Sequence, residues 1–393
     1  MATDGILEKT TLFLEEEETE GTYVAPSAAA SAVSVLKSGV NELIVPSKEV
    51  LERENTNASL DDAASRTGIK SVSGTLPLEF KAGDSEAVPE YGICVESALG
   101  DTSAASSDLS TGADHTTSVI NMASTTGLAI GDIVAVKDAS GNIIHVSPIS
   151  ALTTNTSITL LVADSAAFAD TVTVKKMVDY KTADSGHPSF SATKYETGSD
   201  SDYIETYGAG CKITTMAIEN FVTGQMPTIS FSFEGMSFSE SASSPSYSPT
   251  YDDSLPVVAL GACIYQDGTS LSMSEFSLSL ENTLGYKTTT CSSNGRVGSR
   301  VTNRSITGSL MPYKQDDSVA QYTNWLNDAT FSIFGYAYNP DSSGNLTEVV
   351  AFYLPSVQIT ERSQSDNEGL LQESLTYTAR KHATLPTLRI AYC

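Results

Sequence analysis

The stretch from residue 204 to 238 constrains the fold more than any other part of the chain. It reads IETYGAGCKITTMAIENFVTGQMPTISFSFEGMSF, and its second half alternates between apolar and polar side chains. The apolar set is Ile229, Phe231 and Phe233, and the polar set is Thr228, Ser230, Ser232 and Glu234. A period of two is typical of a strand with one buried and one wet face. The pattern predicts a long antiparallel hairpin, with strands near 211–221 and 227–238 and a turn at 223–225.

The first strand of this hairpin is less regular than the second. Ile213 and Met216 are both apolar, yet they would point to opposite faces of an ideal strand. A β-bulge between them is one way to return both side chains to the same face. The register of this strand therefore stays open at the level of sequence.

The rest of the chain also favours strands over helices. Short alternating runs separated by turn residues dominate the 393 residues, and this spacing is typical of a mainly β protein built as a sandwich or barrel. One segment has helical spacing instead. There Val319, Tyr322 and Leu326 recur every three or four residues, which predicts one flanking helix with these side chains as its core face.

Changes in composition divide the chain. We predict an N-terminal arm at 1–30, a discontinuous β domain at 31–105 and 181–393, and a small barrel-like β domain inserted at 106–180. Ser-, Thr- and Ala-rich segments border the insert, as expected of linkers. The arm carries five carboxylates between Glu15 and Glu20. Such a run is either solvated or able to fold onto a neighbouring subunit.

Charge excludes several classes of partner. The formal net charge is −26, so the chain has no general electrostatic attraction for nucleic acid or for an anionic membrane. No apolar run approaches the roughly 20 residues that span a bilayer. The first residues have no basic and apolar regions of the kind found in a secretion signal, so we expect none, and we expect no membrane association.

Catalytic and metal-binding patterns are also missing from the sequence. It contains no GxSxG, HExxH, CxxC or GxxxxGK[ST] motif. Its four histidines and five cysteines are scattered without ligand spacing. We therefore expect no enzymatic activity, cofactor or metal, and look for function in the protein's surfaces.

Several segments taken in order resemble one protein family. They are GTYVAP, SVSGTLPLEF, KITTMAIENFVTGQMPTISFSFEGM, FSLSLENTL, SRVTNRSITGSL, DDSVAQYTNWLND and VVAFYLPSVQIT. This order of elements resembles the major tail tube proteins of long-tailed, siphovirus-type bacteriophages. The resemblance covers most of the chain outside the insert.

The resemblance implies a structural virion protein made in the host cytoplasm. Six subunits would form a ring, and stacked rings would form the tube through which DNA passes during ejection without specific binding. The hairpin would line the lumen with Thr228, Ser230, Ser232 and Glu234, and its edges would meet identical neighbours. A tape measure protein and a tail terminator or distal tail protein would be further partners, and the insert would lie outside the tube.

The arm and the Ser- and Pro-rich loop at 239–256 would then bridge successive rings, because long irregular loops are often interface-forming. Removing residues 1–30 would abolish long tubes but leave a folded β monomer.

Two other classes remain as alternatives. A carbohydrate- or surface-binding β module of a phage fibre or adhesin would need an aromatic-lined site with converging polar groups. A hydrolytic β-barrel enzyme would need paired carboxylates at catalytic spacing. The sequence offers no pattern of either kind.

Overall fold

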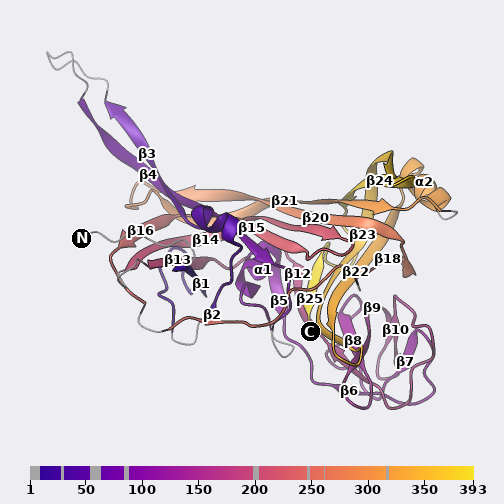
Figure 1. Cartoon of the computed structure of the whole chain (residues 1–393). Helices are drawn as coiled ribbons and strands as arrows, with labels where there is room; N and C mark the ends of the chain where they lie inside the picture. Colours follow the sequence, from indigo (N-terminus) through magenta and orange to yellow (C-terminus); the bar gives the residue numbers. More distant parts are fainter. Residues whose placement is uncertain are drawn as a thin grey trace.

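The structure is a computed structural model that describes residues 9–27, 31–53, 63–83, 88–197, 203–245, 248–260, 262–315 and 318–393. It is mainly β, as predicted, and its strands are joined into one large antiparallel network (Figure 1). Two α-helices lie against this network.

The predicted hairpin is confirmed. Strand β14 (Tyr203–Val222) pairs with β15 (Thr228–Gly235), and Ile218 lies opposite Ile229. The pairing register shifts between Ile213 and Thr215, so a bulge lies in the interval that the sequence left open. Because of this shift, Ile213 and Met216 are both fully buried.

The hairpin lies in the middle of a sheet rather than at its edge. β15 pairs with β4 (Ala63–Glu79), and β14 pairs with β20 (Met273–Thr288). The expectation that the hairpin's edges meet identical neighbours is therefore wrong, because strands of the same chain occupy both edges. A free edge belongs to β3 (Val45–Arg53), which among the described residues pairs with β4 alone and exposes all nine of its residues.

Beyond β20 the sheet continues through long antiparallel strands. In spatial order they are β21 (Arg296–Pro312), β24 (Leu370–Ala379), β23 (Leu346–Asn367), β22 (Thr330–Pro340), β18 (Cys263–Gln266) and β19 (Thr269–Ser270). Figure 1 shows the β3–β4 hairpin projecting from the body at the end opposite to the second helix.

A second layer covers one face of this sheet. On one side it contains β25 (Arg389–Tyr392), β12 (Val178–Thr182) and β5 (Gly100–Ser103). On the other side the first half of β14 pairs with β13 (Phe190–Thr197) and β16 (Ser237–Ser241), and β13 pairs with β1 (Thr11–Glu16). The long strand β14 thus belongs to both layers.

Helix α1 (Gly92–Leu99) fills the space between the layers. Six of its eight residues are buried, and the preceding Tyr91 packs on Phe231, with ring centroids 5.8 Å apart. Gly100 ends the helix in the left-handed conformation, at φ 102°. The sequence predicted only one helix, because a helix buried on all sides shows no alternation of polar and apolar faces.

Helix α2 (Ser318–Leu326) is the flanking helix that the sequence predicted, but the predicted core face is wrong. Val319, Tyr322 and Leu326 are 68%, 42% and 59% exposed. Ser318 and Gln321 are buried instead, and Trp325 packs against the core. The spacing identified the helix correctly, but the helix packs through the adjacent face, which is displaced by one residue, or about 100°, from the predicted one.

Residues 106–180 contain a compact set of short strands with an apolar core of its own. They are β6 (Leu109–Ser110), β7 (Val119–Asn121), β8 (Ile133–Lys137), β9 (Ile143–Thr153), β10 (Ser157–Leu160) and β11 (Thr173–Lys176). A further apolar cluster joins β8 and β9 to β22 and β23. Two short strands, β2 (Ser31–Ala32) and β17 (Thr250–Tyr251), form a separate parallel pair, and a 3-10 helix spans Lys37–Glu42.

A buried ion cluster fixes this unit to the main domain. Arg389 Nη1 lies 2.9 Å from Asp132 Oδ1 and also contacts Asp179. Asp132 precedes β8, Asp179 lies on β12 at the C-terminal end of residues 106–180, and Arg389 lies on β25 in the main domain. Burial raises the pKa of Asp179, and the charge of Arg389 opposes that rise. Residues 106–180 are therefore joined to the rest of the chain by a shared core and by buried charge.

Replacing Phe231 tests the packing of the hairpin. Its side chain is fully buried and packs on Tyr91, so Phe231→Ala should reduce the free energy of unfolding by about 3–5 kcal/mol. The neighbouring Ser230→Ala lies on the other face and should change it by less than about 0.5 kcal/mol. Urea unfolding of the unassembled protein measures both, and equal effects would contradict this placement.

Candidate functional site

The four polar residues singled out in β15 do share one face of the strand. Thr228, Ser230 and Ser232 are partly exposed and Glu234 is exposed, whereas the alternating apolar residues are buried. The pleat that buries the apolar row against α1 therefore turns this polar row away from the core.

The same face continues across the neighbouring strands, which the sequence pattern of one hairpin did not reveal. Cross-strand pairing places small polar residues next to one another over six strands. This surface, called here the hydroxyl face, consists of Ser73, Thr75, Pro77, Glu79, Thr215, Ala217, Glu219, Thr228, Ser230, Ser232, Glu234, Ser277, Ser279, Glu281, Ser305, Thr307, Ser309, Thr376 and Thr378. None of these positions carries Lys or Arg; Lys212, the β14 partner of Glu234, is buried at the end of the face and paired with Glu20, so the exposed surface is neutral to acidic.

Hydroxyl groups on this face bind one another. The Ser277 and Ser309 Oγ atoms are 2.7 Å apart, on adjacent strands. At one end of the face Tyr286 Oη donates to Glu234 at 2.9 Å. Burial raises the pKa of Tyr286, and the carboxylate of Glu234 raises it further, so the phenol keeps its proton. The guanidinium of Arg296 stacks 3.8 Å from the Tyr286 ring, which places a cation at this end only.

The acidic run near the N-terminus is docked on its own chain. Glu17 is buried, and its carboxylate accepts hydrogen bonds from Ser189 Oγ, Ser191 Oγ and the Gly210 amide, each at 2.8 Å, and from the Gly21 amide at 2.7 Å. β1 precedes it and pairs with β13.

Glu20 is held in the same way. It forms an ion pair with Lys212 at 3.1 Å and accepts from the Ser299 amide at 2.7 Å. Residues 9–27 are therefore part of the subunit's own fold and not a free arm, and residues 1–8 and 28–30 lie outside the described part of the chain. Removing residues 1–30 would take away β1 and Glu17, so we expect this truncation to lower the stability of the subunit as well as to affect assembly.

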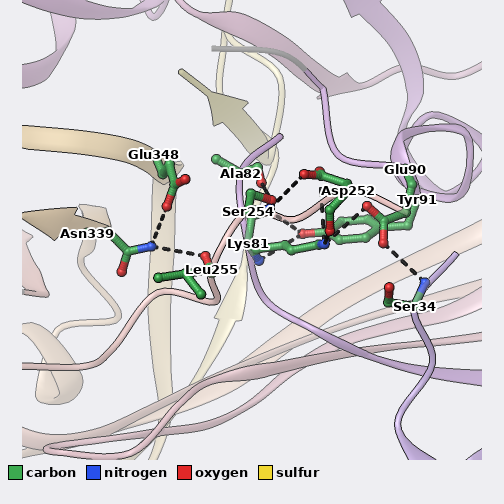
Figure 2. Close-up of polar contacts among 10 residues, drawn as sticks. All are labelled: Ser34, Lys81, Ala82, Glu90, Tyr91, Asp252, Ser254, Leu255, Asn339 and Glu348. Atoms are coloured by element: carbon green, nitrogen blue, oxygen red, sulfur yellow. Dashed lines mark hydrogen bonds and ion pairs between the residues drawn. The ribbon is translucent and has the colours of Figure 1, made fainter. Parts of the chain in front are cut away.

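The end of the loop at 239–256 is also fixed to its own chain (Figure 2). Lys81 Nζ lies 3.2 Å from Glu90 Oε2 and donates to the Asp252 carbonyl at 3.0 Å. Ser254 Oγ donates to the Ala82 carbonyl at 2.9 Å. Burial raises the pKa of Glu90, and its bond from the Ser34 amide and the nearby Lys81 oppose this.

One further contact holds the backbone at Leu255. Asn339 Nδ2 donates to the Leu255 carbonyl at 3.0 Å and to Glu348 Oε2 at 2.6 Å. The Leu255 side chain stays 67% exposed, so this part of the loop is a fixed backbone that presents an apolar side chain.

The described residues offer no group of three or more His, Cys, Asp and Glu side chains that could hold a metal. His145 and His187 hydrogen-bond to backbone carbonyls, and burial lowers the pKa of both. No described helix has the length and apolar character to cross a membrane. The hydroxyl face and the free edge of β3 are thus the features that most need a functional explanation.

Comparison with known proteins identifies the family of the chain. The family model for phage tail tube proteins matches residues 8–379. The chain belongs to this family. No match was found among curated proteins. As a tail tube protein it is a structural component of the phage tail and assembles into a tube, and the match includes the inserted strands.

Replacing Glu17 tests whether the acidic segment belongs to the fold of this tail tube protein. Glu17→Gln removes the charge that four donors stabilise and turns an amide group toward them, so the free energy of unfolding should fall by about 1–3 kcal/mol. Glu18→Gln is the matched control, because Glu18 is exposed. Thermal unfolding with both variants decides the point, and an unchanged Glu17→Gln protein would refute this role.

Proposed function

We propose that this tail tube protein forms six-membered rings that stack into a hollow tube, and that the hydroxyl face of each subunit lines the lumen. The observation that carries the proposal is the continuous surface of small polar and acidic residues over six strands, which includes Thr228, Ser230, Ser232 and Glu234 and meets Lys212 and Arg296 only at its Glu234 end. DNA would pass along this wall during ejection into the host.

The chemistry of the hydroxyl face suits a conduit for DNA. Lys and Arg neutralise phosphates and release counterions, and these contacts supply most non-specific affinity for DNA. A wall without them has no means to hold the backbone. Glu79, Glu219 and Glu281 add negative charge, and at physiological ionic strength their repulsion acts within about 8 Å. The Ser and Thr side chains are also short, so they place no large groups in the path of the DNA.

The free edge of β3 supports assembly through sheet contacts. An exposed edge presents unpaired N–H and C=O groups that readily pair with another chain. Closure into a ring covers such edges in every subunit, because the free edge of each subunit contacts the next subunit around the ring. The position of β3 at the end of the sheet, with β4 as its one partner among the described residues, fits this arrangement.

The remaining parts of the proposal follow from the role of a tail tube. A tape measure protein would occupy the lumen before ejection, and a tail terminator or distal tail protein would bind the ends. Assembly would take place in the host cytoplasm. The inserted unit at 106–180 would lie outside the tube, because its strands pack beside β22 and β23 and contribute no residue to the hydroxyl face.

Electron microscopy of the purified protein tests the assembly. We expect six-fold rings or striated tubes, since the family forms tubes. A protein that stays monomeric over a wide range of concentration and salt would contradict the proposal, as would rings of a different symmetry.

Thiol labelling tests the orientation of the hydroxyl face. Ser230→Cys, in a background without the exposed Cys291, should react in assembled tubes with a small maleimide but not with a large polyethylene-glycol maleimide. Unassembled subunits should react with both reagents. Asp138→Cys on the insert serves as the outer-surface control and should react with both in tubes. If Ser230→Cys in tubes reacts with the large reagent as fully as with the small one, this face lies on the outer surface of the tube and the proposed orientation is wrong.

A further inference from the structure

We propose that a basic cleft beside β21 is the socket for an acidic segment of a second copy of this chain, and that this segment is residues 54–62. The inference rests on the proposed function, in which identical subunits contact one another. It adds a specific pair of surfaces and a charge-based mode of recognition.

The cleft lies between β21 and the segment that follows β24. Its volume is about 740 Å³, and its walls come from residues 182–187, 301–306, 378–382 and 385–387. Five basic residues line it, which are His187, Arg304, Arg380, Lys381 and His382, and Asp184 is its only carboxylate.

This concentration of cations runs against the composition of the chain. Lys and Arg number 22 in the whole sequence, against 48 Asp and Glu. Arg362 and Arg389 have carboxylate partners, whereas half-buried Arg304 has none within ion-pair distance among the described residues, and Arg380 and Lys381 are exposed. Arg304, Arg380 and Lys381 form no ion pair within the described residues. The cleft therefore holds positive charge that the subunit itself does not neutralise.

Hydrogen bonds fix the arginines in the cleft wall. Arg304 Nη2 donates to the Ala183 carbonyl at 2.5 Å and lies 3.1 Å from His187 Nε2. Arg380 Nε donates to Gln358 Oε1 at 2.7 Å. Burial lowers the pKa of His187, so the ring is neutral near pH 7 and the arginines and the lysine supply the charge. Fixed guanidinium groups lose little freedom when a carboxylate binds them.

One wall of the cleft is also an open strand edge. β24 pairs with β21 only from Thr307 to Leu310, while β20 pairs with β21 back to Arg296. Over residues 296–306 the second edge of β21 thus has no strand partner among the described residues; Glu20 and Lys212 bind the backbone of Ser299, so the part that faces the cleft is 301–306. Backbone groups of such an edge can bind an extended segment, and the nearby side chains then select its sequence.

Residues 54–62 have the composition that this cleft would select. They read ENTNASLDD, with three carboxylates at Glu54, Asp61 and Asp62 and no Lys or Arg. They connect β3 to β4, and that hairpin projects from the body at one end of the molecule (Figure 1). All nine residues of β3 are exposed, so the subunit itself leaves this element uncovered.

The two surfaces are different patches of one chain, so their contact is heterologous. Such a contact repeats from each subunit to the next and closes into a ring or extends as a helix. Opposite charges at the two patches would fix the direction in which subunits join and would speed their encounter.

Charge reversal with a reciprocal swap tests the proposal. Arg380→Glu with Lys381→Glu should raise the critical concentration for assembly by about tenfold or more, since reversed charges repel the acidic segment. Asp61→Lys with Asp62→Lys should have the same effect. All four changes in one chain should restore assembly toward the wild-type value. Arg380→Lys with Lys381→Arg keeps the charge and is the matched control. Sedimentation velocity measures assembly, and circular dichroism verifies the fold of each variant.

Several outcomes would overturn the proposal. One is wild-type assembly by the Arg380→Glu, Lys381→Glu protein, and another is a four-fold variant that stays unassembled although folded. If the reversal variants misfold, Arg380→Gln with Lys381→Gln takes their place and should still weaken assembly. A short DNA duplex tests nucleic acid as the alternative occupant of the cleft. If the wild-type protein binds the duplex and the charge variants do not, the cleft is a nucleic-acid site and the proposal is wrong. Failure of the wild-type chain to form rings would instead refute the proposed function.

Discussion

The packing of the apolar row of β15 against the layer that contains α1 is the contact on which the rest of the structure depends. Ile229, Phe231 and Phe233 are buried there, and Tyr91 at the start of α1 packs on Phe231. Since side chains alternate along a strand, burial of this row forces Thr228, Ser230 and Ser232 to the opposite surface. Cross-strand pairing then aligns the polar rows of the neighbouring strands with them. One buried row thus creates a surface six strands wide.

The two ends of the chain are tied to this central layer by buried charge. The Glu17 carboxylate accepts four hydrogen bonds, from Ser189 and Ser191 at the start of β13, from Gly210 on β14 and from Gly21 in the turn that follows Glu17. These bonds fix β1 to the sheet. Arg389 on β25 joins Asp179 and Asp132, which links the last strand to the inserted unit. Removing one partner from such a cluster leaves an uncompensated buried charge, so both contacts are costly to break. They fix β1 and β25 within the subunit, whereas the β3–β4 hairpin projects from it (Figure 1).

Particular elements show how far sequence patterns reach in this protein. The period-two pattern located the hairpin and its buried row, and the conflict between Ile213 and Met216 located the bulge. Helical spacing located α2, yet its packing face is the one with Ser318 and Gln321. The interpretation of Glu15 to Glu20 as an arm was wrong because charge in a sequence carries no information about converging donors. Glu17 is held by groups more than 170 residues away in the chain, except for the Gly21 amide.

The sequence by itself determined the β class, the position of the hairpin and the side chains on each of its faces. These properties follow from local alternation, which depends on a few consecutive residues. The tertiary structure decided which strands flank the hairpin, which face of α2 is buried and where the free sheet edge lies. It also decided that Arg304, Arg380 and Lys381 share one cleft. Each of these properties depends on contacts between distant segments, and such contacts are set by packing of the whole domain rather than by any local pattern.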